Sequence, residues 1–279
     1  DGREFRARRF VASSVNPNQT FLDMVGKENL TAEFVRKVEG YKYSNTTPLF
    51  TLHLALNERM SWKAADYDPD VNKSFYLICG LEGLRDIEEL YQDCAARRLP
   101  RSLQLLGAQP AQHDPSQAPP GKCTAFFWQV APGNLCTEEG GRDRWDKIRQ
   151  EFTDRCAAHL AHYATNLTPA NIVHKFGVTP LDIERHLPNM VGGDIVVGEM
   201  SKDQILEKRP FPECSQYRTP INGLYLCGSS AHPGGNITGG PGYNAAGVIC
   251  SDLGMQPWWK PKDAAAEWEA LAAREAGGR

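Results

Sequence analysis

Near its C-terminal end the sequence reads Leu224-Tyr-Leu-Cys-Gly-Ser-Ser-Ala-His-Pro-Gly-Gly-Asn-Ile-Thr-Gly-Gly-Pro-Gly-Tyr-Asn-Ala-Ala246, an apolar run followed by a glycine-rich segment. We expect Leu224–Leu226 to form a short buried strand and residues 242–253 to form a helix. The start of such a helix carries unpaired backbone N–H groups and a partial positive charge of ~0.5 e, which suits a phosphate or an anionic ring edge. A glycine-rich turn taken alone is equally consistent with a plain surface loop.

Further motifs precede this segment and extend the pattern over most of the chain. Pro-Leu-Asp-Ile-Glu-Arg-His occupies 180–186, Gly-Gly-Asp-Ile occupies 192–195 and Arg-Pro occupies 209–210, while Val-Ala-Ser-Ser-Val-Asn-Pro stands at 11–17. Together with the glycine-rich segment they resemble the C-terminal flavin-binding signature of phytoene desaturase-like FAD-dependent oxidoreductases, of the pyridine nucleotide-disulphide oxidoreductase domain-containing type. The resemblance is loose at first and tight after Thr179, and it implies an FAD cofactor.

The first half of that family's dinucleotide site is missing from the sequence. Family members carry G-x-G-x-x-G between a strand and a helix to hold the FAD pyrophosphate, and residues 239–242 lack the third glycine at that spacing. The chain opens instead with Asp1-Gly2, a favoured hairpin turn, followed by strand-like residues 3–13. We therefore expect a C-terminal portion, as a fragment, a proteolytic product or a separate subunit, whose G-x-G-x-x-G half is supplied by a complementary polypeptide.

The composition is that of a globular protein. The 279 residues are 41% hydrophobic and 23% charged, which allows a sizeable core and one or two domains. A net charge of −3 argues against a nucleic-acid partner. The 8 cysteines contain no C-x-x-C pair, so we assign no metal ligands and favour a reducing, cytoplasmic compartment. No apolar run reaches the ~20 residues of a membrane helix, while the resemblance leaves peripheral contact with a membrane open.

Hydrophobic periodicity predicts alternating strands and helices in the middle of the chain. The clearest helix spans 143–164, where Trp145, Ile148, Phe152 and Cys156 recur at steps of three and four. The other expected strands are 47–57, 74–79, 103–106, 123–130, 172–178 and 194–198; the other expected helices are 30–41, 83–98, a short one capped by Thr179-x-x-Asp182, and one in the tail after 263.

The resemblance implies a mixed α/β fold with two domains. The chain would be the C-terminal portion of an FAD-dependent oxidoreductase, with a mixed-sheet substrate domain inserted in an incomplete Rossmann-like FAD domain. We accordingly expect an edge piece of the FAD-binding domain at 1–17, a substrate-binding domain at 18–205, a C-terminal FAD-binding segment at 206–260 and a tail at 261–279. Phe126 and Trp128 share one strand face that could line a hydrophobic substrate cavity, with core packing as the simpler explanation.

The resemblance also implies which residues meet the cofactor. Backbone N–H groups at the helix start would face the N1 and C2 carbonyl edge of the flavin ring, where negative charge develops on reduction. His232 is a weak candidate for an acid or base, and shaping the loop is its simpler role. The residues expected to bind FAD are Gly228, Ser229, His232, Pro233, Gly234, Gly235, Asn236, Ile237, Gly239, Gly240, Pro241, Gly242, Tyr243 and Asn244.

Three functions stay open at this point. By resemblance, the chain is a C-terminal portion or subunit of a flavin-dependent oxidoreductase that transfers a hydride from a small hydrophobic substrate to FAD N5, in a desaturation or an amine or alcohol oxidation. Alternatively, it is a non-catalytic assembly or scaffold subunit that has kept the fold and lost the flavin. A hydrolase using Ser230 and His232 is disfavoured, because two residues so close in a turn lack the geometry of a nucleophile and its base without a third orienting group.

Overall fold

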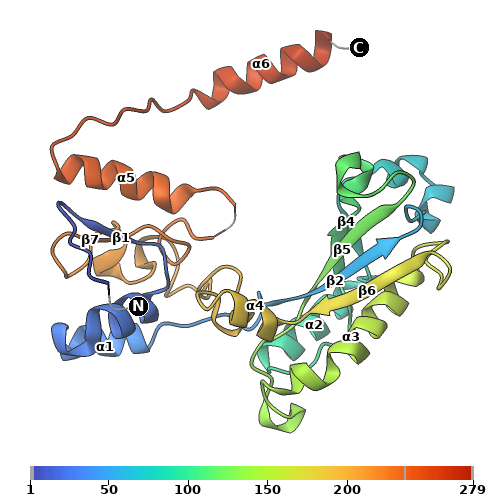
Figure 1. Ribbon diagram of the computed structural model, residues 1–279, viewed down its shortest axis with the longest axis horizontal. Helices are drawn as coiled ribbons and strands as arrows, with labels where there is room; N and C mark the ends of the chain where they lie inside the picture. The colour runs from blue at the N-terminus through green and yellow to red at the C-terminus, as the bar shows by residue number, and fades with distance from the viewer. Residues whose placement is uncertain (1–2, 236, 278–279) are drawn as a thin grey trace.

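The larger of two packed units is built on an antiparallel sheet of five strands in the order β3-β4-β5-β2-β6 (Figure 1). The computed structural model describes residues 3–235 and 237–277. The five strands are β2 (Leu49–Leu56), β3 (Leu77–Cys79), β4 (Leu105–Ala108), β5 (Cys123–Val130) and β6 (Ile172–Val178). The predicted bounds of β5 and β6 are confirmed, and the mixed α/β class of the fold is confirmed with them.

Helix α3 (Arg144–Ala161) supplies the largest part of the core on one face of this sheet. Its predicted stripe is buried from Trp145 through Ile148 and Phe152 to Cys156. Trp145 is fully buried and its indole N–H donates to the Pro132 carbonyl over 3.1 Å, so burial leaves no donor unpaired. Helix α2 (Leu84–Ala95) adds Leu90 and Cys94 to the buried residues of this unit.

The opposite face of the sheet carries half-exposed aromatic rings. Along β5 burial alternates, so that Phe127 is buried while Phe126 and Trp128 face the other side. On that side His53 of β2 stands opposite both Phe126 and Phe176, and its ring stacks on Phe176 at 4.7 Å. Burial lowers the pKa of His53, so its imidazole is neutral at neutral pH. We call this surface the open sheet face.

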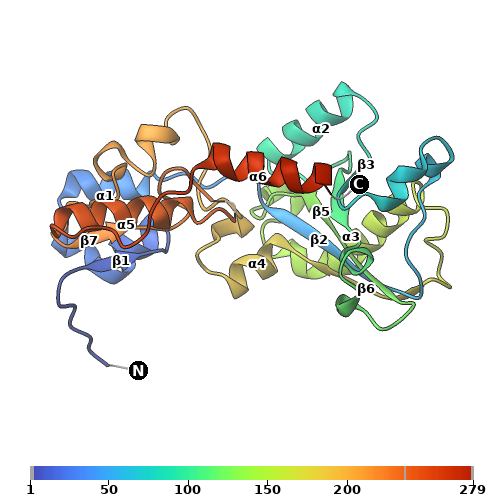
Figure 2. The same cartoon turned by 90° about the horizontal axis from the view of Figure 1, so that it is seen from above.

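The smaller unit holds a parallel pair of short strands, β1 (Val11–Ser13) and β7 (Leu224–Leu226), which come from opposite ends of the chain. Helices α1 (Ala32–Glu39) and α5 (Gly240–Asp252) accompany the pair (Figures 1 and 2). Its core joins Phe21, Phe34 and Val38 to residues near β7 such as Phe211 and Leu226.

Residues 18–43 therefore pack differently from the expected division of the chain. The expectation placed everything from 18 to 205 in the inserted unit, yet the helical segment Asn18–Gly26 and α1 bury their apolar faces in the core of β1 and β7. Phe34 contacts both Phe21 and Phe211, with ring centroids 4.9 and 5.8 Å away. An amphipathic helix indicates that it packs on something without indicating which core receives it.

Two expected strands are absent or shortened in the described chain. Within 3–13 only Val11–Ser13 is a strand, and it pairs in parallel with β7 rather than in a hairpin; Asp1 and Gly2 lie outside the described residues. Residues 194–198 form no strand beyond one isolated bridge between Pro48 and Asp194. There the Asp194 side chain organises the backbone, with positive φ at Val197 and Gly198.

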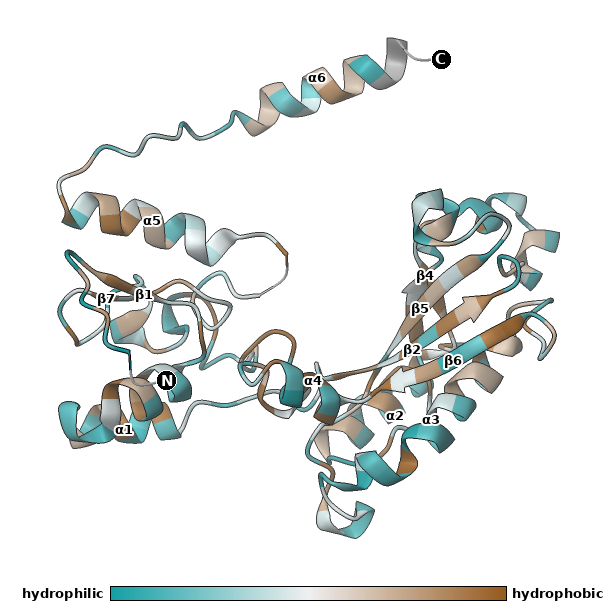
Figure 3. Cartoon of the chain, in the orientation of Figure 1, coloured by the Kyte–Doolittle hydropathy of each residue, from teal (hydrophilic) through white to brown (hydrophobic). Residues whose placement is uncertain are grey.

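Short helices close the two ends of this arrangement. Helix α4 (Pro180–His186) begins with the predicted capping box, in which Thr179 Oγ1 accepts the Asp182 N–H and the Asp182 carboxylate accepts the Thr179 N–H. Helix α6 (Ala264–Gly277) forms the tail and stands away from both units (Figure 1). In Figure 3 the strands of both sheets include hydrophobic segments, while α1 and α3 show hydrophilic residues as well.

The alternation along β5 leads to a stability prediction. Phe127→Ala should lower the free energy of unfolding by about 3–5 kcal/mol, because it leaves a cavity in a closed core. Phe126→Ala removes the same ring from the open sheet face and should cost clearly less. Chemical denaturation of both variants measures the difference, and equal losses would contradict the assignment of the two faces.

Candidate functional site

The predicted strand, turn and helix at the C-terminal end are all present. Leu224, Tyr225 and Leu226 are buried, as expected for β7, and α5 begins at Gly240. Gly228 follows β7 and lies against the Ser14 backbone so closely that a Cβ atom there would stand 2.0 Å from the Ser14 carbonyl oxygen. A side chain at 228 would therefore separate β1 from the turn.

The start of α5 offers fewer free donors than a helix start usually does. The Gly240 N–H is taken by Thr238 Oγ1 at 3.1 Å, Pro241 has no N–H, and the Tyr243 N–H donates to the Gly239 carbonyl. Among the described residues the Gly242 N–H has no partner, and the space beside Gly239 is open, since a Cβ there would meet nothing within 4 Å. These residues fit a flat anionic edge at the helix start, with Gly242 as its donor.

The turn before α5 folds back toward the segment 196–200. Gly234 approaches Met200 and Arg209, and Gly235 approaches Val196. Ile237 is fully exposed and Pro233 is exposed as well, whereas Asn236 lies outside the described residues. The expected cofactor residues thus form one continuous rim, of which the Ile237 side chain contacts nothing else.

His232 is held by Tyr217 rather than by an acidic partner. The Tyr217 hydroxyl donates to the His232 carbonyl over 2.9 Å and accepts a hydrogen bond from the Asn244 amide over 2.9 Å. The His232 Nδ1 atom is buried and has no partner in the described part of the chain, which costs about 1–3 kcal/mol in a folded protein. The geometry supports a loop-shaping role for His232, and no described carboxylate orients it as a base.

Arg209 is the polar centre behind this turn. It is completely buried, and its guanidinium donates to the carbonyls of Val196 at 2.8 Å and Ser229 at 2.9 Å, with longer contacts to Gly198 and Gln204. Backbone dipoles surround the charge in place of a carboxylate. Arg209 therefore fixes Ser229, an expected cofactor residue, to the segment that returns from the larger unit.

Asp194 is the second buried charge, at the point where the chain leaves the larger unit. Its carboxylate accepts hydrogen bonds from the N–H groups of Ser44, Val196 and Gly198 and from the Thr47 hydroxyl at 2.7 Å. Nearby, the Tyr41 hydroxyl donates to the Val197 carbonyl at 2.8 Å, and burial raises the pKa of Tyr41. The two chain crossings between the units are thus bonded to each other.

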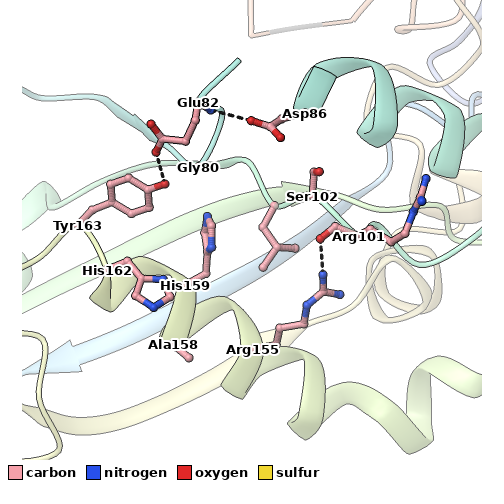
Figure 4. Close-up of a pocket in the computed structure, with 11 residues that line it drawn as sticks. Gly80, Glu82, Asp86, Arg101, Ser102, Arg155, Ala158, His159, His162 and Tyr163 are labelled. Atoms are coloured by element: carbon pink, nitrogen blue, oxygen red, sulfur yellow. Dashed lines mark hydrogen bonds between the residues drawn. The ribbon is translucent and has the colours of Figure 1, made fainter. Parts of the chain in front are cut away.

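Three of the expected cofactor residues line one cavity beside α5. His232, Tyr243 and Asn244 face a space of about 470 Å³ whose remaining wall includes Tyr217 and Trp259. A second cavity of about 490 Å³ lies at α3 in the larger unit (Figure 4) and contains none of them.

The cavity at α3 has an internally bonded polar lining. Tyr163 donates to Glu82 over 2.6 Å, which raises the pKa of Tyr163 to about 12, and Arg155 donates to the Arg101 carbonyl over 2.7 Å (Figure 4). Burial is the main cause that lowers the pKa of His159.

Arg209, Asp194 and Tyr217 are the residues that sequence reasoning did not assign to the site. Arg209 and Asp194 stand in motifs that carried the resemblance, but only as letters in a pattern. A charge inside an otherwise apolar run, such as Arg209 before Pro210 and Phe211, was the available signal of burial.

The described residues contain no group of three or more His, Cys, Asp or Glu side chains arranged around a common metal position. Within 3–235 and 237–277, no helix combines the length and the apolar character that crossing a bilayer requires.

Comparison with known proteins places the chain among oxidoreductases. No protein-family model matches it. One of the two subunits named for limonene dehydrogenase in Castellaniella defragrans is 31% identical over 96% of this chain and 48% of its own length. Pyridine nucleotide-disulfide oxidoreductase domain-containing protein 2 of Mus musculus is 32% identical over 91% of this chain and 43% of its own length.

A lycopene-forming phytoene desaturase of Pantoea ananas is 24% identical over 91% of this chain and 47% of its own length. The predicted kinship with phytoene desaturase-like oxidoreductases is therefore confirmed: the chain is homologous to them over most of its length. The chain spans about half the length of the curated relatives it matches.

Replacing the buried guanidinium tests its role in holding the site. Arg209→Met should lower the free energy of unfolding by about 3–5 kcal/mol, because the carbonyls of Val196 and Ser229 lose their donors inside the protein. Arg85→Met is the control, since Arg85 is 88% exposed and pairs only with Glu89 among the described residues, and it should cost less than about 0.5 kcal/mol. Urea denaturation of both variants provides the measurement, and a tolerated Arg209→Met would contradict the role of Arg209.

Proposed function

We propose that this chain is the C-terminal portion or subunit of a flavin-dependent oxidoreductase whose N-terminal dinucleotide-binding half lies on another stretch of polypeptide. The observation that carries the proposal is the unit of β7, glycine turn and α5, with the open Gly242 N–H and the clear space at Gly239 aimed at one locus. The homology to oxidoreductases supports the reaction class. FAD is the group we propose for this locus, with the rim residues as its contacts.

The free edge of β1 supports a complementary polypeptide. Val11 and Ser13 direct their backbone groups to β7, as shown by the hydrogen bonds Val11 N to Gly223 O and Cys227 N to Ser13 O. In a parallel ladder Ala12 then points its N–H and C=O away from β7. Val11 is 52% exposed, and an apolar hollow of about 320 Å³ with Met24 in its wall lies beside it. A further parallel strand would satisfy this edge and cover the hollow.

The name of one relative agrees with a divided enzyme. The Castellaniella protein is named as a subunit of a dehydrogenase. A sheet of only two short strands is a small structure to hold a dinucleotide, and strands from a second half would extend it. We propose that this second half carries the G-x-G-x-x-G loop that is missing here.

When bound, FAD would accept a hydride at N5 and gain negative charge at its N1 and C2 carbonyl edge. The Gly242 N–H and the dipole of α5 would stabilise that charge by about 0.3–2 kcal/mol. Arg209 lies behind the turn and would hold the rim in place through Ser229. His232 would shape the turn through its carbonyl bond with Tyr217.

The open sheet face supports a hydrophobic organic substrate. Phe126, Trp128 and Phe176 present their rings on the side of the sheet that no described helix covers, and His53 is half-buried among them. Such a surface suits a hydrocarbon-like molecule with few polar atoms. We propose that this face meets the substrate of the hydride transfer.

The flavin proposal predicts a coloured complex. Isolated from its native cells through a tag on this chain, the assembly should contain a second segment or chain with G-x-G-x-x-G and should show the visible absorbance bands of a flavin. Gly242→Val should weaken flavin retention at least tenfold, about 1.4 kcal/mol, because a branched side chain crowds the open N–H. Gly83→Val, at the start of α2 with equally open space, is the matched control and should retain the flavin.

A colourless assembly at full occupancy would contradict the flavin proposal and favour the scaffold alternative. Equal flavin retention by the two valine variants would move the flavin edge away from the start of α5.

A further inference from the structure

A cavity of about 470 Å³ lies along one side of α5, between the helix and the chain that returns after it. Its walls come from Tyr217 before β7, from Tyr243, Asn244 and Gly247 on α5, and from Trp259 after the helix. We call it the Trp259 cavity. Its volume falls within the range of small-molecule sites, roughly 300–1,000 Å³.

The walls of the Trp259 cavity are flat and aromatic. The rings of Tyr243 and Trp259 lie with centroids 5.9 Å apart, and Trp258 packs against Trp259. On the helix side, a Cβ atom at Gly247 would meet nothing within 4 Å, so the backbone of α5 itself forms part of the wall. Aromatic faces opposite a bare stretch of helix suit a thin, planar ligand.

One wall is held rigidly. Tyr217 is buried and adopts a φ of 67°, which a residue with a side chain rarely adopts, and its hydroxyl is bonded to both the His232 carbonyl and the Asn244 amide. Strained backbone of this kind is kept where the surroundings over-determine it, often at binding sites. The hydroxyl is the acceptor for one Asn244 hydrogen, which leaves the second amide hydrogen for a ligand.

The polar groups around the cavity are neutral. Among the described residues that line it there is no carboxylate, ammonium or guanidinium group; the polar side chains are those of Tyr217, Asn244, His232 and Gln216. A phosphate or carboxylate entering here would lose hydration without gaining a countercharge. Lys260 and Lys262 line a separate hollow on the far side of Trp259.

We propose that the Trp259 cavity binds a neutral planar ring compound bearing carbonyl oxygens. The aromatic walls hold the ring faces, and the free hydrogen of the Asn244 amide donates to a carbonyl. The cavity reaches Val248, eight residues beyond Gly240, which is roughly 12 Å along a helix that rises 1.5 Å per residue. It is therefore a site separate from the ring edge proposed at the helix start, and it does not depend on flavin being present.

The test uses 2,3-dimethyl-1,4-naphthoquinone as the probe, because both vinyl carbons are blocked against the eight free cysteines. Its partner probe is 2,3-dimethylnaphthalene, which has the same rings without the carbonyls. Equilibrium dialysis with the purified 279-residue chain should give at least tenfold tighter binding of the quinone. Equal binding of the two probes would overturn the polar part of the proposal.

Variants at one position locate the site. Gly247→Leu should weaken quinone binding at least tenfold by filling the slot, while Gly247→Ala should stay within threefold of the parent. Both replacements favour the helix, so the fold is retained, and far-UV circular dichroism checks this. Asn244→Ala should narrow the affinity ratio of the two probes. Unchanged quinone binding by Gly247→Leu would overturn the location.

The same dialysis on the flavin-containing assembly separates this inference from the proposed function. Quinone binding of unchanged affinity beside bound flavin supports a separate site. Exclusion of the probe by bound flavin would make the cavity the seat of the flavin ring and overturn the separate site, while leaving the flavoprotein proposal intact.

Discussion

Two buried charges, neither of them in an ion pair with a described residue, hold the two units of this chain together. Arg209 donates to carbonyls from the segment around Val196 and from Ser229, and Asp194 accepts N–H groups from both crossings of the chain. Each charge is stabilised by several oriented backbone dipoles, which is effective only while the surrounding loops keep their shape. The loops in turn have little regular hydrogen bonding of their own, so the charge and the loop depend on each other.

This arrangement explains why the glycine turn can be both irregular and defined. Arg209 fixes the beginning of the turn at Ser229, Gly228 lets it pass against Ser14, and the hydroxyl of Tyr217 fixes its middle at His232. The start of α5 then satisfies two of its own positions through Thr238 and Gly239, so that the Gly242 N–H remains for a ligand. The rim is preorganised from behind, by residues that no ligand at its front would touch.

Much of the fold was readable in the sequence where periodicity is strong. The alternation of β5, the stripe of α3 and the Thr179 capping box are local patterns, and local patterns predicted them correctly. Packing partners are not local: the choice of core by residues 18–43, and the parallel pairing of β1, depend on residues near 211 and 224. The Trp259 cavity likewise needs Tyr217 and Trp259 on either side of α5, which no motif links.

The pairing of Val11 with Leu224 has a consequence for how the chain assembles. A strand made early must wait for a partner roughly 200 residues later, and closing so long a loop slows folding. The larger unit removes most of that delay if it folds first, because the Asp194 carboxylate lies 2.9 Å from the Ser44 N–H and so brings its entry and exit together. During synthesis the interior of the polypeptide would become ordered before its two ends, and the nucleotide-facing turn would be the last part completed.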